Sequence, residues 1–148
     1  VSPQARAWVR DMIVEILEDH TTIRFVDETG GQTGEAGQWA PAWLPEGYEL
    51  TDETDLGTRS RQIYRNIDGH RIIFEYATTA TAFSYDNEHH VKKTVLVNGI
   101  SAHLLQTIKT GHESSLTWYD QASGTAFSLM SELPADELIR IAESVEKN

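Results

Sequence analysis

The side chains best suited to chemistry in this chain are six histidines among 23 acidic residues. The densest group is the segment DNEHH, in which Asp86, Glu88, His89 and His90 are all potential metal ligands. In an extended segment neighbouring side chains point to opposite faces, so His89 and His90 cannot both reach one ion without a bulge or a turn. The chain has no His-Glu-x-x-His motif, which binds zinc on a helix. We therefore interpret DNEHH as a polar loop or strand end and predict no metal site.

The four other histidines lie where ordinary structural roles account for them. His20 follows a predicted helix, and an imidazolium there favours the negative end of the helix dipole. His70 lies next to a predicted turn, His103 on the wetter face of a predicted strand, and His112 in a predicted loop. None of the four predicts a site.

The motifs of known catalytic and nucleotide-binding sites are missing. The glycine-rich segment TGGQTGEAG lacks the lysine and the strand-to-helix context of a phosphate-binding loop. The acids of TDETD do not follow the order of a calcium-binding EF-hand loop, and no Gly-x-Ser-x-Gly motif is present. With 23 acids, some pair will always lie at glycosidase distance, so their presence alone supports no mechanism. The sequence predicts no catalytic residue, no cofactor and no enzymatic activity.

The composition is that of one folded domain with its own core. Of 148 residues, 39% are hydrophobic and 24% are charged, as in globular proteins. The net charge of -11 repels phosphate backbones, so we exclude nucleic acid as a partner. The absence of cysteine excludes thiol nucleophiles and disulfides. No apolar run is long enough to span a bilayer. The start VSPQARAW, without methionine, suggests an upstream segment, in which we expect any membrane anchor.

Two amphipathic helices are predicted, one at each end of the chain. At the start, Ser2 and Pro3 have the order of an N-cap followed by a proline in the first turn. Apolar residues then recur at three- and four-residue spacing, which predicts a helix over residues 1–20. At the other end, a proline and two acids mark a helix start and an apolar stripe follows. This pattern predicts a helix over residues 133–147.

Between these helices the sequence predicts a short strand in TIRFVDE, a flexible connector over residues 29–42 and an antiparallel sheet over residues 43–131. In the last of these the hydrophobic period is two and turn signals arrive at short intervals. Asp68-Gly69 and Asn98-Gly99 each favour a tight type I′ hairpin turn. The expected fold class is α+β, with a single domain over residues 1–148. In it an antiparallel meander of about six strands is bracketed by the two helices, which cover one face.

The candidate binding residues are aromatic and surround the segment WLPEGYELTDETD. Pro45 and Gly47 favour a reversal of the chain there, and a structural corner is the favoured interpretation. The same aromatics could line a groove on the sheet face that the helices leave open. The candidate ligand-binding residues are Trp39, Trp43, Tyr48, Tyr64 and Trp118.

Four segments, in their order, resemble a known bacterial family. They are PAWLPEGYELTD, QIYRNIDGHRIIFEY, VLVNGISAHLL and SSLTWYDQASGTAFSLMSELPADELIRIAESV, which together resemble domain of unknown function 4367 over residues 40–146. The resemblance implies the extracytoplasmic part of a Gram-positive bacterial protein with a single membrane anchor, often with a cytoplasmic segment that looks like an anti-sigma factor. The family carries no established catalytic residues, so the resemblance implies none here.

Three functions are compared on this basis. The favoured one is a noncatalytic sensor or interaction domain of a membrane-anchored regulator, whose partner is an unknown protein or small ligand. Its contact with the membrane is expected only through an upstream anchor. The alternative is a carrier-like module that binds a lipid or peptide on its sheet. The least favoured function is that of a cell-wall hydrolase with an acid such as Glu75 or Asp120.

Overall fold

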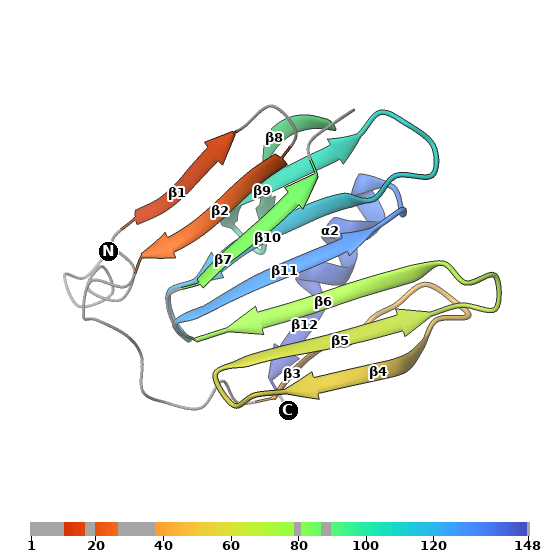
Figure 1. Cartoon of the computed structure of the whole chain (residues 1–148). Coiled ribbons are helices and arrows are strands. Elements are labelled where there is room, and N and C mark those ends of the chain that lie inside the picture. The colour runs from red at the N-terminus through yellow and green to blue at the C-terminus, as the bar shows by residue number, and fades with distance from the viewer. Residues whose placement is uncertain (1–10, 17–19, 27–37, 79–80, 87–89, 148) are drawn as a thin grey trace.

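The computed structural model describes residues 11–16, 20–26, 38–78, 81–86 and 90–147, in which the chain is mostly β-sheet (Figure 1). Every strand pairing is antiparallel. In this described part, α2 (Ala135–Glu143) is the one helix. The strands are β1 (Asp11–Ile16), β2 (His20–Val26), β3 (Trp39–Pro41), β4 (Glu49–Asp55), β5 (Arg59–Arg65), β6 (Arg71–Ala77), β7 (Thr81–Asp86), β8 (His90–Val97), β9 (Ile100–Thr107), β10 (Ser114–Asp120), β11 (Thr125–Ser131) and β12 (Val145–Lys147).

Seven strands form the main sheet, in the order β4-β5-β6-β11-β10-β9-β8. Each half of this sheet is a meander, because β4 to β6 and β8 to β11 follow one another along the chain. Between the halves, β7 leaves the main sheet and pairs with β2. As a result β6 and β11, which are not consecutive, meet at the centre with Phe74 opposite Leu129. This central pairing brings remote parts of the chain together.

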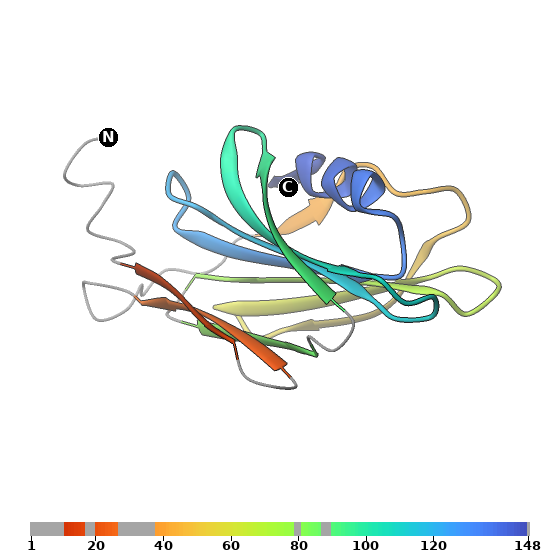
Figure 2. The same cartoon turned by 90° about the horizontal axis from the view of Figure 1, so that it is seen from above.

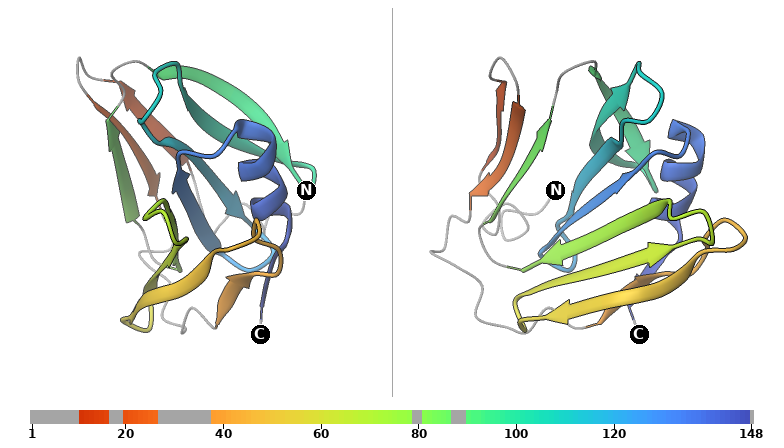
Figure 3. Two further views of the ribbon diagram at one scale, coloured as in Figure 1. Left: turned by 90° about the vertical axis from the view of Figure 1, so that its right-hand side faces the viewer. Right: turned by 45° about the vertical axis from the view of Figure 1, so that its right-hand side comes forward.

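The two faces of the main sheet have different neighbours (Figures 2 and 3). α2 and the pair of strands β3 and β12 lie on one face, and the three-stranded sheet β1-β2-β7 lies on the other. Successive side chains of a strand alternate between the faces. The helix face carries the apolar core, whose fully buried members include Phe74, Leu116 and Leu129. The opposite face carries a polar row of cross-strand neighbours, which are Glu75, Ser128, Thr117 and His103.

The predicted C-terminal helix is confirmed as α2, although it is shorter than residues 133–147. Its apolar stripe buries Leu138, Ile141 and Ala142 against the main sheet, while its first turn carries two acids that complement the helix dipole. The helix ends at Glu143, and the following residues form β12, which pairs with β3. The predicted connector over residues 29–42 therefore contains a strand at its end. Residues 29–37 of that connector lie outside the described part.

The expected α+β fold class is wrong: the structure is mainly β and has more strands than the six expected. Residues 11–16 were expected in an N-terminal helix over residues 1–20, but they form β1, whereas the short strand predicted in TIRFVDE overlaps β2. The Ser2-Pro3 start lies outside the described residues. The physical reason is tertiary pairing, since β2 hydrogen-bonds to β1 on one side and to β7 on the other. No N-terminal helix exists in the described part of the chain.

One of the two predicted type I′ turns is confirmed. Asn98 (φ 49°) and Gly99 (φ 82°) both adopt the left-handed region in the two-residue turn between β8 and β9. Asn98 is the only non-glycine residue with positive φ in the described part, so the turn between β5 and β6 is of another kind. There the amide of Gly69 donates to the carbonyl of Asn66, and Gly69 alone has positive φ. The type I′ prediction for Asp68-Gly69 is therefore wrong.

Candidate functional site

The five aromatic residues predicted to bind a ligand belong to the apolar core and its margin, under α2. Tyr64 and Trp118 are buried, with exposed fractions of 7% and 3%. Trp39, Trp43 and Tyr48 are partly buried against the same cluster. Each of the outer two tryptophans has a packing role, because Trp39 contacts Phe127 edge to face with centroids 5.1 Å apart and the guanidinium of Arg140 lies 3.9 Å from the Trp43 ring.

These aromatics lie together in or against the core cluster, and α2 covers the face on which they lie. None of them lines either of the two hollows that are described below. The assignment of ligand binding to these residues stays a prediction.

The two acids considered for hydrolysis do not form a carboxylate pair. Glu75 lies on the polar face of β6 and forms an ion pair with Arg59 at 3.3 Å. Asp120 ends β10 at a position of the opposite face, where its carboxylate accepts hydrogen bonds from the amide of Ala122 and the hydroxyl of Ser123. Both acids have structural partners, and they lie on opposite faces of the sheet.

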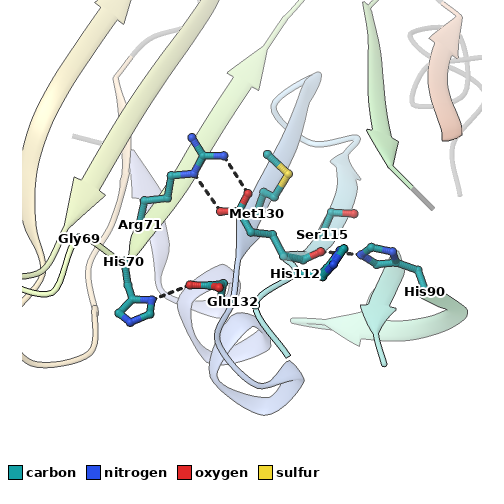
Figure 4. A pocket seen from close by; sticks show the side chains of 10 residues that line it. Gly69, His70, Arg71, His90, His112, Ser115, Met130 and Glu132 are labelled. Atoms are coloured by element: carbon teal, nitrogen blue, oxygen red, sulfur yellow. Dashed lines mark hydrogen bonds and ion pairs between the residues drawn. The ribbon is translucent and has the colours of Figure 1, made fainter. Parts of the chain in front are cut away.

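A hollow of about 420 Å³ lies at one end of the main sheet, where the β5–β6 loop, the β9–β10 loop and the residues before α2 approach one another (Figure 4). Most of its lining is polar or charged, and three of its residues are histidines. The lining comes from β6, β8, β10, β11 and the loops between them. It consists of Gly69, His70, Arg71, His90, Gly111, His112, Glu113, Ser115, Met130 and Glu132.

A bidentate ion pair forms one wall of the hollow. Arg71 at the start of β6 donates from Nε and Nη2 to the two carboxylate oxygens of Glu113, at 3.0 and 2.9 Å. This hydrogen bonding and the charge of Glu113 raise the pKa of Arg71. The backbone carbonyl of Glu113 lies 2.6 Å from Nε2 of His90. The pairings hold the β9–β10 loop against β6 and the start of β8, which are remote in the sequence.

A second contact, between His70 and Glu132, borders the hollow on the side toward α2. Nδ1 of His70 lies 2.6 Å from Oε2 of Glu132, which follows β11 directly. His70 is itself fixed, because its amide donates to the side-chain oxygen of Asn66 at 2.9 Å. Tyr48 lies near this end, since the charge of Glu132 adds to burial in raising the pKa of its phenol. The hollow thus sits between two carboxylates, each of which contacts a basic side chain.

The floor of the hollow is formed by Ser115 and Met130, which face each other across β10 and β11. Ser115 is 3% exposed, and its side chain lines the hollow. A hydroxyl group that lines a hollow can donate a hydrogen bond to a ligand or to water, or accept one. Met130 offers a polarisable apolar surface beside Ser115.

A second hollow of about 500 Å³ adjoins the first on the side of α2. It shares His70, Gly111, His112 and Glu132 with the first hollow, and it is otherwise lined by the end of β9, the β9–β10 loop and the start of α2. The shared residues form a ridge between the two spaces. The end of the sheet is therefore broadly concave.

The arrangement is suited to recognition and does not assemble catalytic groups. In the described part of the chain, no group of three or more His, Cys, Asp or Glu side chains is placed to hold a metal ion. Glu113 and Glu132 each already contact a basic side chain. Nε2 of His90 is directed to a backbone carbonyl, and no imidazole within the described residues contacts the Ser115 hydroxyl as a general base would.

Sequence reasoning missed this site. His70, His90 and His112 were each given ordinary roles, because their spacing of about twenty residues matches no ligand motif. The only sequence signal was indirect: the predicted turns at Asp68-Gly69 and in KTGHES, if placed at one end of a sheet, gather these histidines.

Comparison with known proteins gives one match. The family model described as Domain of unknown function (DUF4367) matches residues 38–145. No curated protein matches the chain. No solved structure matches it either. In the part that the structure describes, no helix has the length and apolar character needed to cross a membrane.

Proposed function

Because the chain belongs to the family of domain of unknown function 4367, we propose that it is a noncatalytic sensor or interaction domain. It serves a membrane-anchored regulator of the anti-sigma-factor-like kind and lies on the extracytoplasmic face of the cell membrane. Its task is to bind a small molecule or a partner protein at the hollow at the end of the main sheet.

The observation that carries this proposal is the hollow itself. Its volume of about 420 Å³ is in the range of small-molecule sites, and its shape is held by the Arg71–Glu113 ion pair and the His70–Glu132 contact, which join remote segments. Ser115 lines the hollow, where its hydroxyl can hydrogen-bond to a ligand. These features support binding at this site.

The absence of enzymatic activity is part of the proposal. A nucleophile needs an adjacent base, and a general acid needs a carboxyl group kept neutral by its surroundings. Asp52 and Asp55, by contrast, have pKa values lowered by local hydrogen bonds, which keep them ionised, and they lie on β4 outside the hollow. The chemistry of the described residues therefore favours recognition.

The carrier-like alternative is not proposed, because the aromatic face that it requires is packed against α2.

The location can be tested by cysteine labelling, since the chain has no cysteine of its own. A Gln121→Cys variant places a thiol in the exposed β10–β11 turn, on the natural full-length protein in its own cell. We expect a membrane-impermeant maleimide to label it in intact cells. The matched control is Thr117→Cys, a fully buried position that should react only after denaturation. Labelling of Gln121→Cys only after lysis would contradict the extracytoplasmic placement.

The role of the hollow can be tested in the same cells through the output of the regulator. Ser115→Ala removes a hydroxyl that lines the hollow, and Arg71→Lys removes the bidentate pair while keeping the charge. We expect each to change the transcriptional output, whereas Ser101→Ala, an exposed position on β9, should not. Unchanged output in both hollow variants, with normal protein levels, would remove the hollow as the sensing site.

A further inference from the structure

The two edges of the main sheet carry opposite charges. β4 forms one edge and β8 the other, and in the described part of the chain neither has a second strand partner. They lie at opposite margins of the molecule (Figure 3). β4 contains four acids and no basic residue, whereas β8 contains two lysines and no acid. An unpaired edge is a template for a further strand, and its charges select which strand it accepts.

Both edge strands are open to solvent on their two faces. Every residue of β4 is exposed, as are five of the eight residues of β8. Two of the exposed side chains are large and apolar, since Leu96 on β8 is 61% exposed and Leu56, directly after β4, is 72% exposed. A contact that covers both leucines at once is favourable, because it removes apolar surface from water.

The lysines and acids of the two edges lie in the same cross-strand rows. The six pairings that lead from β4 to β8 are all antiparallel, so the two edge strands run in the same direction. One row, on the helix face, consists of Glu53, Gln62, Phe74, Leu129, Leu116, Leu104 and Lys93, and the other, on the opposite face, of Asp52, Ile63, Ile73, Met130, Ser115, Leu105 and Lys92. A second copy that continues the sheet in the same orientation therefore places an edge acid beside each edge lysine.

On β8 the outward-facing backbone groups follow from the turn that ends the strand. Val97 pairs with Ile100 across a two-residue turn, where the flanking residues hydrogen-bond to each other. Backbone groups alternate in direction along a strand. Those of Lys93 therefore point to β9, as those of Val97 do, whereas those of Lys92 and Thr94 point outward.

On β4 the outward-facing groups complement this pattern. The amide of Leu56 donates to the carbonyl of Arg59 at 2.8 Å, so the backbone groups of Leu56 point toward β5. Three residues earlier, those of Glu53 point outward. In a parallel pair, a residue hydrogen-bonds to the two neighbours of the residue opposite it. Glu53 opposite Lys93 thus meets two residues whose groups point outward.

We propose that copies of this chain assemble head to tail, with β4 of one copy added to β8 of the next as a parallel strand. Glu53 then lies opposite Lys93. The same register places Leu56 beside Leu96, because each leucine lies three residues further along its strand. The occupant of each edge is a second copy, since the charges that one edge requires lie on the other edge of the same chain. Two identical edges repel each other.

Such an interface joins two different surfaces, so it leaves an unpaired β4 at one end of the assembly and an unpaired β8 at the other. Growth therefore continues beyond a dimer. The inference goes beyond the proposed function, because it uses the edges of the sheet and does not depend on ligand binding at the hollow.

Sedimentation velocity of the 148-residue chain tests the assembly at concentrations from about 10 μM to about 1 mM, the range of weak association. We expect the mean mass to rise with concentration and to pass that of a dimer. Thr94→Pro should prevent this rise, because proline removes an outward N–H and leaves the β8–β9 hydrogen bonds in place. Circular dichroism shows whether this variant is folded; if it is not, the charge variants decide alone.

The charge variants test the register. Glu53→Lys and Lys93→Glu should each weaken association at least about fivefold, because an attraction becomes a repulsion. An equimolar mixture of the two should restore it, since every junction between unlike copies again joins opposite charges. Glu146→Lys and Lys109→Glu are the matched controls. They make the same changes of charge at exposed positions outside β4 and β8, and they should associate like the wild type.

Four results would overturn the inference. The first is a wild type that stays monomeric at about 1 mM. The second is assembly that stops at a dimer, which indicates pairing of identical surfaces. The third is a mixture of the two charge variants that associates no better than either alone, and the fourth is a folded Thr94→Pro variant that assembles like the wild type. None of these results bears on the proposed function, whose tests measure labelling in intact cells and transcriptional output.

Discussion

Replacing His103 by leucine should stabilise the protein. His103 lies on the polar face of β9, between Thr117 of β10 and Thr94 of β8. Its Nδ1 is buried and has no hydrogen-bond partner in the described part of the chain. An unsatisfied buried polar atom costs about 1–3 kcal/mol, and leucine has no such atom at similar volume. We therefore expect His103→Leu to raise the free energy of unfolding by about 1–2 kcal/mol at pH 7.5.

The stability advantage of His103→Leu over the wild type should be larger in acid. The reason is that burial, and to a lesser extent the charge of Lys92, lowers the pKa of His103 in the folded protein. The unfolded imidazole titrates at about 6.5. Below that pH the unfolded state binds more protons than the folded state, so the wild type loses stability as the pH falls. His103→Leu lacks this titration, and its advantage over the wild type should be larger at pH 5.5 than at pH 7.5.

Urea titrations at both pH values give the free energies of unfolding. Thermal unfolding provides a check, because the midpoint temperature should rise by about 2–4 °C for each kcal/mol gained. Ser101→Leu is the matched control: it adds the same side chain to the same face of β9 at an exposed position, and it should change stability by less than about 0.5 kcal/mol. A variant less stable than the wild type at both pH values would refute the reasoning. A difference between variant and wild type that does not vary with pH would show that His103 is not the titrating group.

Three further changes test other parts of the fold. Ile141→Ala removes a fully buried side chain of α2 and should lower the free energy of unfolding by about 2–5 kcal/mol in urea, whereas Glu137→Ala, at a partly exposed position of the same helix, should change it by less than about 0.5 kcal/mol. The pKa of Tyr64 is raised to about 12 by burial and by the charges of Glu53 and Tyr76. Since the unfolded phenol ionises at about 10, stability should fall between pH 10 and 12, and Tyr64→Phe should remove the late step of an ultraviolet titration. Gly99→Ala should cost about 1–2 kcal/mol of thermal stability through backbone strain alone, because φ is 82° and the added methyl group meets no atom within 4 Å.

The parts of the fold that could be predicted have signals in adjacent residues. α2 was found because its proline, its acids and its apolar stripe all lie within one short segment. The Asn98-Gly99 turn was found because the φ angles of a type I′ turn depend on those two residues. The family resemblance is equally local, and the family match confirms it.

The N-terminal strands show where local signals fail. The apolar residues of the first segment recur at helical spacing, yet Asp11–Ile16 is a strand. Its stability comes from β2, and that of β2 comes in turn from β7, about sixty residues further on. Methionine, valine and isoleucine suit a strand as well as the buried side of a helix, so the partner decides between the two.

The sequence by itself determined that this chain forms a folded domain of the 4367 family, with a short C-terminal helix, hairpins and no catalytic motif. Only the tertiary structure decided which residues meet. Arg71 and Glu113 are 42 residues apart, and His70 and Glu132 are 62 apart. They come together because β6 pairs with β11 and not with its successor in the chain. The pairing of remote strands depends on the packing of both sheet faces at once, which no single segment encodes.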